Sequence, residues 1–260
     1  MHARRLALRT GFAGMLGAMS DPSWRVLPHS PPETMEDNLW RVEGELEGMP
    51  LKRVMTVAKR SDGGLVVHNG IALAEDVMRE IEAFGEPAFL VVPNGYHRMD
   101  AGRYKARYPK LKVVCPRGAK KKVEQVVSVD LDYEAYPQDE AVGLRTLEGL
   151  GEAEGIMTVR SSDRVSLVLN DALFNMPHLS GVHGFVLKHL TSSSGGPKVS
   201  RVARWFIIKD KHAFRAELEK LALYTGLTPY NVEQSKLRIQ PFRFFKELLR
   251  DENRTVGRLD

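Results

Sequence analysis

Hydrophobic positions in the first part of the chain change from alternation to helical spacing. Residues 39–43 and 53–58 alternate apolar and polar side chains, which predicts two strands, and Leu65–His68 follows a Gly-containing turn as a third. From Leu73 to Phe84 the apolar residues recur at helical spacing, and Gly85 marks the end of the helix that this spacing predicts. An opening meander of strands therefore leads into a helix.

Strands and helices alternate further along the chain. Phe89–Val92 is a continuous apolar run, which is typical of a buried strand, and Leu111–Cys115 is another predicted strand. Between them, residues 103–108 predict a short helix that ends at Pro109. A meander followed by strand–helix alternation predicts a layered α/β architecture.

The second half of the chain has a similar organisation. Ile156–Val159 and Val165–Leu169 predict a hairpin, and Lys211–Tyr224 predicts an amphipathic helix. Trp205–Ile208 fits either a strand or a buried helix, and Pro241–Leu249 predicts a terminal helix with three phenylalanines. We expect Leu65–His68, Phe89–Val92 and Val165–Leu169 to be buried strands.

The N-terminal 36 residues differ in composition from the rest. Arg4 and Arg5 precede small apolar residues in the manner of an export signal, but Arg9 interrupts that stretch. Residues 21–36 contain four prolines and show no apolar periodicity. We expect residues 1–36 to be a poorly ordered extension of a cytoplasmic protein, with export as the alternative, and residues 37–260 to form one domain. Deletion of residues 1–34 should then change the melting temperature little.

Composition excludes several classes of protein. Hydrophobic residues make up 43% and charged residues 27%, as in soluble globular proteins, and no apolar run is long enough to span a bilayer. The single cysteine, Cys115, cannot form an intramolecular disulfide or a thiolate zinc site, and it reads as a small apolar residue. The net charge is +5, and the basic run Arg117–Lys122 lacks interleaved aromatics. We therefore expect a solvated helix start there and no nucleic-acid partner.

The segment from Val168 to Phe174, Val-Leu-Asn-Asp-Ala-Leu-Phe, resembles a motif of the metallo-β-lactamase superfamily. That family carries Gly-Asp-x-Leu-Phe at the end of a strand, and its Asp lies between two metal ions. The order of the predicted elements is similar too. The resemblance covers residues 37 to 224, and it implies a four-layer αββα sandwich of metallo-β-lactamase type with Asp171 at the metal position.

The loop that supplies most metal ligands in this family departs from its motif. The family has His-x-His-x-Asp-His before x-Gly-Gly. Aligned on Gly102, the four ligand positions are held here, in order, by Asn94, Tyr96, Arg98 and Met99. Arg is a poor substitute because it is itself a cation. The segment is similar to an uncharacterised branch of the superfamily with the loop Pro-Asn-x-x-His, here Pro93 to His97.

The later ligand positions are altered as well. The family's Gly-His-x-x-Gly motif compares with Gly151–Gly155, where Glu152 stands at the histidine position unless the strand register is shifted. The region of the last family histidine, residues 227–235, contains none. This pattern indicates a degenerate metal site.

We expect the loops after Val92 and Leu169 to meet at one cleft, because carboxyl ends of strands carry functional loops in layered α/β folds. Its candidate residues are Asn94, His97, Arg98 and Asp171. Zinc or another divalent metal would be bound by His97 and Asp171 with His183, and the absence of any cofactor is equally compatible with the sequence. Further candidates are His68, His178 and Glu152. If Arg98 points into the cleft, it neutralises Asp171 in place of a metal.

Two functional hypotheses remain open. The first is a divergent, metal-dependent hydrolase in which water attacks an ester, amide or phosphoester. The alternative is a non-catalytic domain that binds a small molecule or a protein in a relic of the metal cleft. The sequence specifies neither a substrate nor an oligomeric state.

Overall fold

The computed structural model describes residues 23–162, 164–176, 196–199 and 203–224, together with residues 181, 185, 189 and 201. Within these ranges, most of the strands and helices that the sequence predicts are present, with boundaries shifted by up to four residues. The predicted helix Pro241–Leu249 lies outside the described residues.

The first half forms a seven-stranded mixed sheet whose strands follow one another in chain order. The strands are β1 (Glu33–Glu36), β2 (Leu39–Leu46), β3 (Met49–Lys59), β4 (Leu65–His68), β5 (Pro87–Val91), β6 (Lys112–Cys115) and β7 (Leu131–Asp132). Strands β1 to β4 pair antiparallel, as expected for a meander, and β4 to β7 pair parallel. The parallel strands are connected by α2 (Glu75–Phe84), α3 (Ala101–Arg107), and the short turns η2 (Arg117–Ala119) and α4 (Lys120–Val123).

The second half forms a smaller antiparallel sheet and a helix. The sheet has the order β10 (Val165–Val168), β9 (Gly155–Arg160) and β8 (Val142–Thr146). Strands β11 (Phe174–Met176) and β12 (Gly196–Lys198) form a separate pair, and η4 (Ala203–Ile207) precedes α6 (Lys211–Tyr224).

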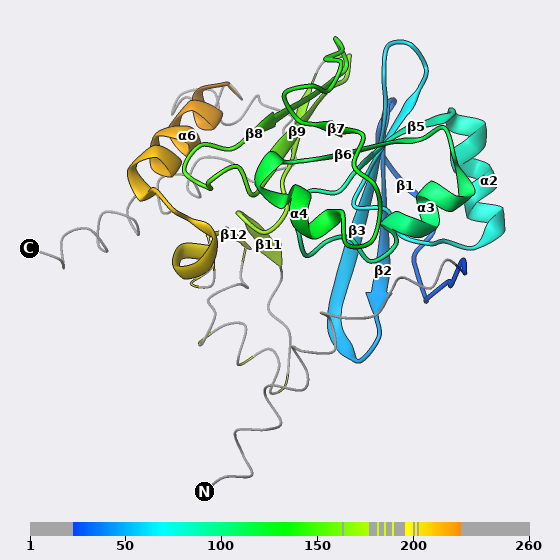
Figure 1. Cartoon of the computed structure of the whole chain (residues 1–260), viewed down its shortest axis with the longest axis horizontal. Helices are drawn as coiled ribbons and strands as arrows, with labels where there is room; N and C mark the ends of the chain where they lie inside the picture. The colour runs from blue at the N-terminus through cyan, green and yellow to red at the C-terminus, as the bar shows by residue number, and fades with distance from the viewer. Residues whose placement is uncertain are drawn as a thin grey trace, which may run out of the picture.

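Three hydrophobic cores separate four layers of secondary structure. Successive residues of β4 contribute to different cores: Leu65 packs on the helices α2 to α4, whereas Val66 faces the second sheet. On β9, Met157 faces the first sheet and Ile156 packs towards α6. Figure 1 shows α6 at one edge of the molecule and α2 at the other, with the sheets between them. This is the αββα sandwich that the sequence predicts.

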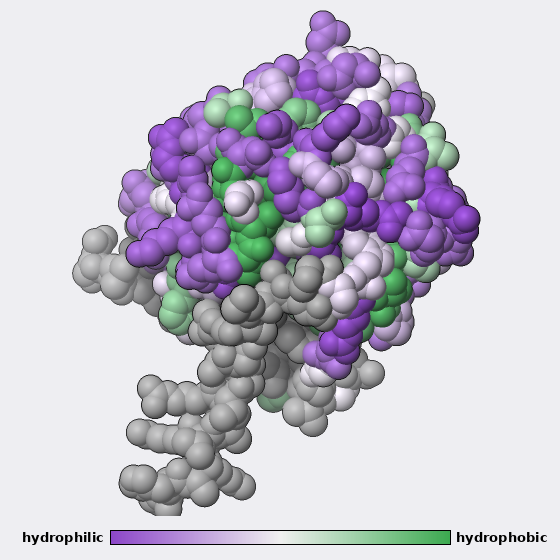
Figure 2. Space-filling model, turned by 45° about the vertical axis from the view of Figure 1, so that its right-hand side comes forward, coloured by the Kyte–Doolittle hydropathy of each residue, from purple (hydrophilic) through white to green (hydrophobic). Residues whose placement is uncertain are grey.

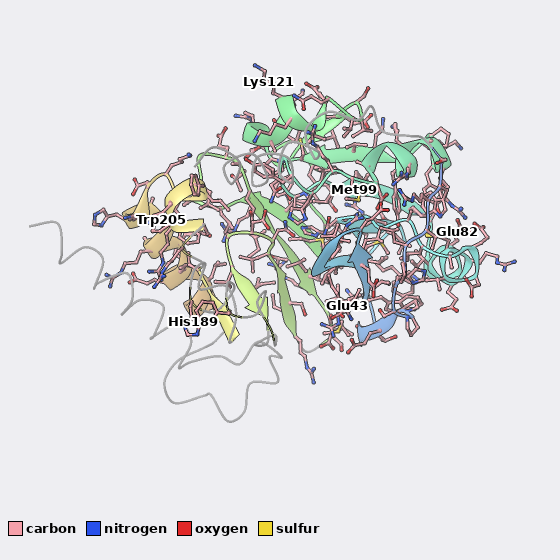
Figure 3. The ribbon with its side chains drawn as sticks, turned by 90° about the horizontal axis from the view of Figure 1, so that it is seen from below. Glu43, Glu82, Met99, Lys121, His189 and Trp205 are labelled. Atoms are coloured by element: carbon pink, nitrogen blue, oxygen red, sulfur yellow. The ribbon has the colours of Figure 1, made fainter. Side chains whose placement is uncertain are left out.

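Two of the expectations about burial are wrong. Leu65–His68 is fully buried as predicted, but every residue of β10 is only partly buried, because β10 is an edge strand that pairs with β9 alone among the described strands. The segment at Trp205 is a π-helical turn rather than a strand or a buried helix. Trp205 and Phe206 are 71% and 70% exposed, and Figure 3 shows Trp205 on the opposite side of the molecule from Glu82.

Residues 23–36 do not match the expectation of a poorly ordered extension. The indole Nε1 of Trp24 donates a hydrogen bond of 2.8 Å to the carbonyl of Leu73. Its ring lies 5.2 Å from that of Tyr104, and the Arg107 guanidinium lies over its face at 5.0 Å. Strand β1 then extends the first sheet. The ordered domain therefore starts before residue 37, whereas poor order of residues 1–22 stays a prediction.

None of the helices among the described residues is long and apolar enough to cross a bilayer. The face shown in Figure 2 is mainly hydrophilic, with a narrower hydrophobic area near its middle. Cys115 is buried in the core beneath the helices, and burial raises the pKa of its thiol to about 12. The thiol is therefore an apolar packing group, as predicted, and not a nucleophile.

Candidate active site

Asn94 organises the loop that follows β5. Its side-chain oxygen accepts hydrogen bonds from the backbone amides of Tyr96 (2.9 Å) and His97 (3.2 Å), which folds the loop into a tight turn. Its side-chain nitrogen donates to Asp171 at 2.9 Å and lies 3.4 Å from an oxygen of Glu154. Asn94 is 5% exposed, so this amide lies in the interior and joins the two halves of the chain.

Asp171 lies in the loop after β10 and accepts hydrogen bonds at both of its oxygens. Oδ1 is 3.0 Å from Nε2 of His97, and Oδ2 accepts from Asn94. Burial alone would raise the pKa of Asp171. The hydrogen bond and charge of His97, together with the hydrogen bond from Asn94, outweigh burial, so the pKa of Asp171 lies below its ordinary value. Asp171 is therefore a carboxylate at neutral pH, and Nε2 of His97 carries the proton between them.

The side chains of His97 and Asp171 are 28% and 21% exposed, so solvent reaches the pair. These contacts show that the two loops meet, whereas the role of their residues in a functional cleft stays a prediction. The prediction placed Asn94, His97 and Asp171 together, and the structure brings all three within hydrogen-bonding distance.

Arg98 is directed away from this group. Its guanidinium donates to the backbone carbonyl of Lys122 and to the side-chain oxygen of Gln125 (2.8 Å). The idea that Arg98 neutralises Asp171 is therefore wrong, because His97 and Asn94 occupy both carboxylate oxygens. Tyr96 also points outward, since its ring is 61% exposed and lies beneath the ammonium of Lys122.

Met99 is 40% exposed, and its sulfur accepts a hydrogen bond from Arg53. In the view of Figure 3 it lies between Lys121 and Glu82. Neither Met99 nor Tyr96 therefore contributes to the group around Asp171.

The carboxylate of the second half that reaches the site is Glu154, not Glu152. Glu152 lies in a turn with a left-handed φ of 56° and is exposed, 4.0 Å from Arg117. Glu154 is 1% exposed, and its Oε1 accepts the backbone amides of Asn170 and Ala172. The family motif aligns Glu152 with the ligand position, two residues before Glu154, because the turn before β9 shifts the register. The one feature of the sequence that pointed to Glu154 is its position directly before a buried strand.

The two acidic groups of the site have opposite pKa shifts. Burial, and then the neighbouring Asp171 carboxylate, raise the pKa of Glu154 to about 8, although its hydrogen bonds to amide groups oppose this. Glu154 is therefore protonated at neutral pH while Asp171 is ionised. Carboxyl groups whose pKa values are separated in this way are typical of acid–base sites.

His68 ends β4 and is 2% exposed, and its Nε2 has no hydrogen-bond partner among the described residues. Burial, and then the charge of His97, lower the pKa of His68 to about 3, so it is neutral. The other histidine candidates, His178 and His183, lie outside the described residues. A role of His183 as a ligand stays a prediction.

The donor atoms of the described residues do not fit a zinc ion. A metal ligand must be deprotonated and must offer a free lone pair. His97 Nδ1 and His68 Nε2 offer such lone pairs, but two imidazoles alone do not make a zinc site. Both oxygens of Asp171 already accept hydrogen bonds, and Glu154 retains its proton. Within the part of the chain that the structure describes, no group of three His, Cys, Asp or Glu side chains is arranged to hold a metal ion.

Elemental analysis of protein purified without chelator or histidine tag should therefore find less than one tightly bound zinc per chain. A metal would have to replace the hydrogen bonds of Asp171 to His97 and Asn94, and Asn is a weak neutral ligand. An Asn94→His variant is the informative comparison, because it restores an imidazole and should raise the zinc content. Two zinc ions per wild-type chain would contradict the degenerate-site hypothesis.

No protein-family model and no curated protein matches the chain. Solved metallo-β-lactamase structures do. VMB-1 is 9% identical, and the match covers 89% of this chain and 100% of that chain with a TM-score of 0.53. A metallo-β-lactamase from Pontibacter korlensis is 8% identical, with 75% and 86% covered and a TM-score of 0.48. The chain thus has the metallo-β-lactamase fold. This conclusion rests on the similarity to VMB-1.

Proposed function

We propose, on the basis of this fold and of the His97–Asp171 hydrogen bond, that the protein is hydrolase-like and that His97 promotes the attack of water on an ester, amide or phosphoester. The observation that carries the proposal is the 3.0 Å contact between an ionised carboxylate and an imidazole that solvent can reach. Carboxylate–histidine pairs orient the imidazole and stabilise its protonated form, as in hydrolytic triads.

The direction of the hydrogen bond assigns the roles of the two ring nitrogens. Asp171 accepts from Nε2, so the proton of the neutral ring lies there and Nδ1 carries the lone pair. None of the described residues donates a hydrogen bond to Nδ1. It can accept a proton from water as the oxygen attacks the substrate, and it returns this proton to the leaving group. Asp171 remains ionised throughout and balances the charge of the imidazolium.

An esterase assay with para-nitrophenyl acetate tests the proposal. Replacement of His97 with Ala, or of Asp171 with Asn, should lower kcat/KM by roughly 10²–10⁴-fold, the contribution of a positioned acid–base group. Asn at position 171 donates a hydrogen bond and thereby favours the wrong tautomer of His97. The matched control is His212→Ala, because His212 is exposed on α6.

Treatment with a chelator should leave the wild-type rate unchanged, since the proposed proton transfer uses only protein groups. Wild-type activity that survives His97→Ala, or that disappears with the chelator, would contradict this mechanism.

Binding of a small molecule without turnover is the second candidate function. It is favoured by the mutual hydrogen bonding of the polar groups, since both oxygens of Asp171 already accept hydrogen bonds from His97 and Asn94. The unpartnered Nε2 of His68 adds a buried hydrogen-bonding position near His97. A compound that raises the melting temperature of the wild type but not of Asp171→Asn, with no product formed, would support binding over hydrolysis.

A further inference from the structure

Glu154 occupies a rigid place beside the proposed reaction centre. It directly precedes β9, the central strand of the second sheet, and it is almost completely buried. The next residue, Gly155, packs so closely on Tyr133 that a Cβ atom would lie 2.1 Å from the ring. Only glycine allows the backbone at position 155 to lie this close to Tyr133. The backbone that carries Glu154 is therefore held at a fixed distance from the first half of the chain.

The carboxyl group of Glu154 accepts hydrogen bonds from the backbone on both sides of Asp171. Its Oε1 accepts from the amide of Asn170 at 3.2 Å and from the amide of Ala172 at 2.9 Å. These two amides flank Asp171 and would otherwise be buried donors without a partner, a costly arrangement. The contact therefore sets where the Asp171 side chain projects from its loop.

The other oxygen of Glu154 lies towards the first half of the chain. Oε2 is 3.4 Å from the side-chain nitrogen of Asn94, which also donates to Asp171 at 2.9 Å. One amide group thus lies between the two carboxyl groups, and the same residue orders the backbone of His97. A displacement of Glu154 would therefore shift both His97 and Asp171.

We propose that Glu154 is the positioning residue of this site, and that it holds Asp171 in register with His97 through the two backbone amides that flank Asp171. It does not touch the reacting atoms, because it lies behind Asp171 and Asn94. The inference rests on the proposed function for its effect on rate, but the placement of His97 can be measured without any substrate.

The test compares Glu154→Ala and Glu154→Gln with the wild type. Gln is the neutral isostere of a protonated Glu and keeps an oxygen for both amides, whereas Ala leaves both amides unpaired. Two readouts are used: the NMR signal of the His97 Nε2–H proton, and kcat for ester hydrolysis at pH 7. Glu152→Gln and Glu152→Ala are the matched controls, since Glu152 is exposed two residues away.

We expect Glu154→Ala to lose the hydrogen-bonded Nε2–H signal and to lower kcat by roughly 10–100-fold, the range seen when a residue that orients a functional group is removed. Glu154→Gln should retain the signal and most of the rate at pH 7. The Glu152 variants should match the wild type.

An unchanged His97 signal in Glu154→Ala would overturn the positioning role. If Glu154→Ala fails to fold, Glu154→Asp decides, because its carboxyl group is one methylene too short to reach both amides, and an unchanged His97 signal there would also overturn the positioning role. If no variant hydrolyses the ester, the proposed function fails, while the NMR comparison still tests the placement of His97.

Discussion

Deletion of residues 1–34 should lower the melting temperature by about 10 °C relative to deletion of residues 1–22 alone. The difference reports residues 23–34, which include Trp24 and the beginning of β1. Loss of a largely packed Trp costs roughly 3 kcal/mol, and removal of strand pairing adds to this. For a domain of this size, each kcal/mol corresponds to about 2–4 °C.

The single variant Trp24→Ala should reproduce much of this loss, because it removes the ring that packs on Tyr104 and beneath Arg107. Trp24→Phe is the matched control, since it keeps an aromatic ring but loses the hydrogen bond to Leu73. Thermal denaturation followed by circular dichroism gives the comparison. Melting temperatures within about 2 °C for the two deletions would restore the expectation that the sequence alone gives.

Replacement of Asp100 with Ala should lower the free energy of unfolding by roughly 3–5 kcal/mol, the cost of leaving a buried charge without its partner. Asp100 is 3% exposed, and its Oδ2 is 2.7 Å from Arg53, which is 7% exposed. Its other oxygen pairs with Arg103. The second amino group of Arg53 donates to the carbonyl of Gly70 at 2.7 Å, so the network joins β3, the loop after β4 and the start of α3.

Denaturant unfolding measures this effect. The double variant Arg53→Met with Asp100→Ala should recover part of the lost stability, because it removes both buried charges. Glu124→Ala is the control, since its pair with Lys120 is exposed at both ends and should change the stability by about 0.5 kcal/mol or less. A loss as small as that of Glu124→Ala would show that Asp100 is readily solvated.

The sequence predicted that the loops of Asn94, His97 and Asp171 lie together, because each loop follows a strand of strong apolar character. Strand ends of layered folds carry their loops to a common edge, so the position of a loop follows from the order of the strands. It did not predict Glu154, because the turn before β9 contains three left-handed residues, Gly149, Gly151 and Glu152. Sequence spacing does not reveal which of two nearby carboxylates such a turn directs inward.

Two other differences have local causes. Arg98 turns outward because the hydrogen bonds of Asn94 fold the loop, and Arg98 then finds partners on and after α4. The N-terminal segment has four prolines, which predict weak attachment to the rest of the domain. The hydrogen bonds of Trp24 and His29 to the residues just before α2, and the pairing of β1, attach it nonetheless. Such contacts join residues far apart in sequence, and periodicity carries no information about them.

The hydrogen bonds of Asn94 also protect this residue from deamidation. Asn followed by Gly is the dipeptide most prone to deamidation, because the unhindered Gly nitrogen attacks the side-chain amide carbon to close a five-membered ring. In the folded protein, this side chain is held by backbone amides on one side and by Asp171 on the other. It cannot rotate towards the nitrogen of Gly95. Deamidation is thereby confined to moments when the loop opens, and it would place a third carboxylate beside Asp171 and Glu154, so that such an opening becomes irreversible.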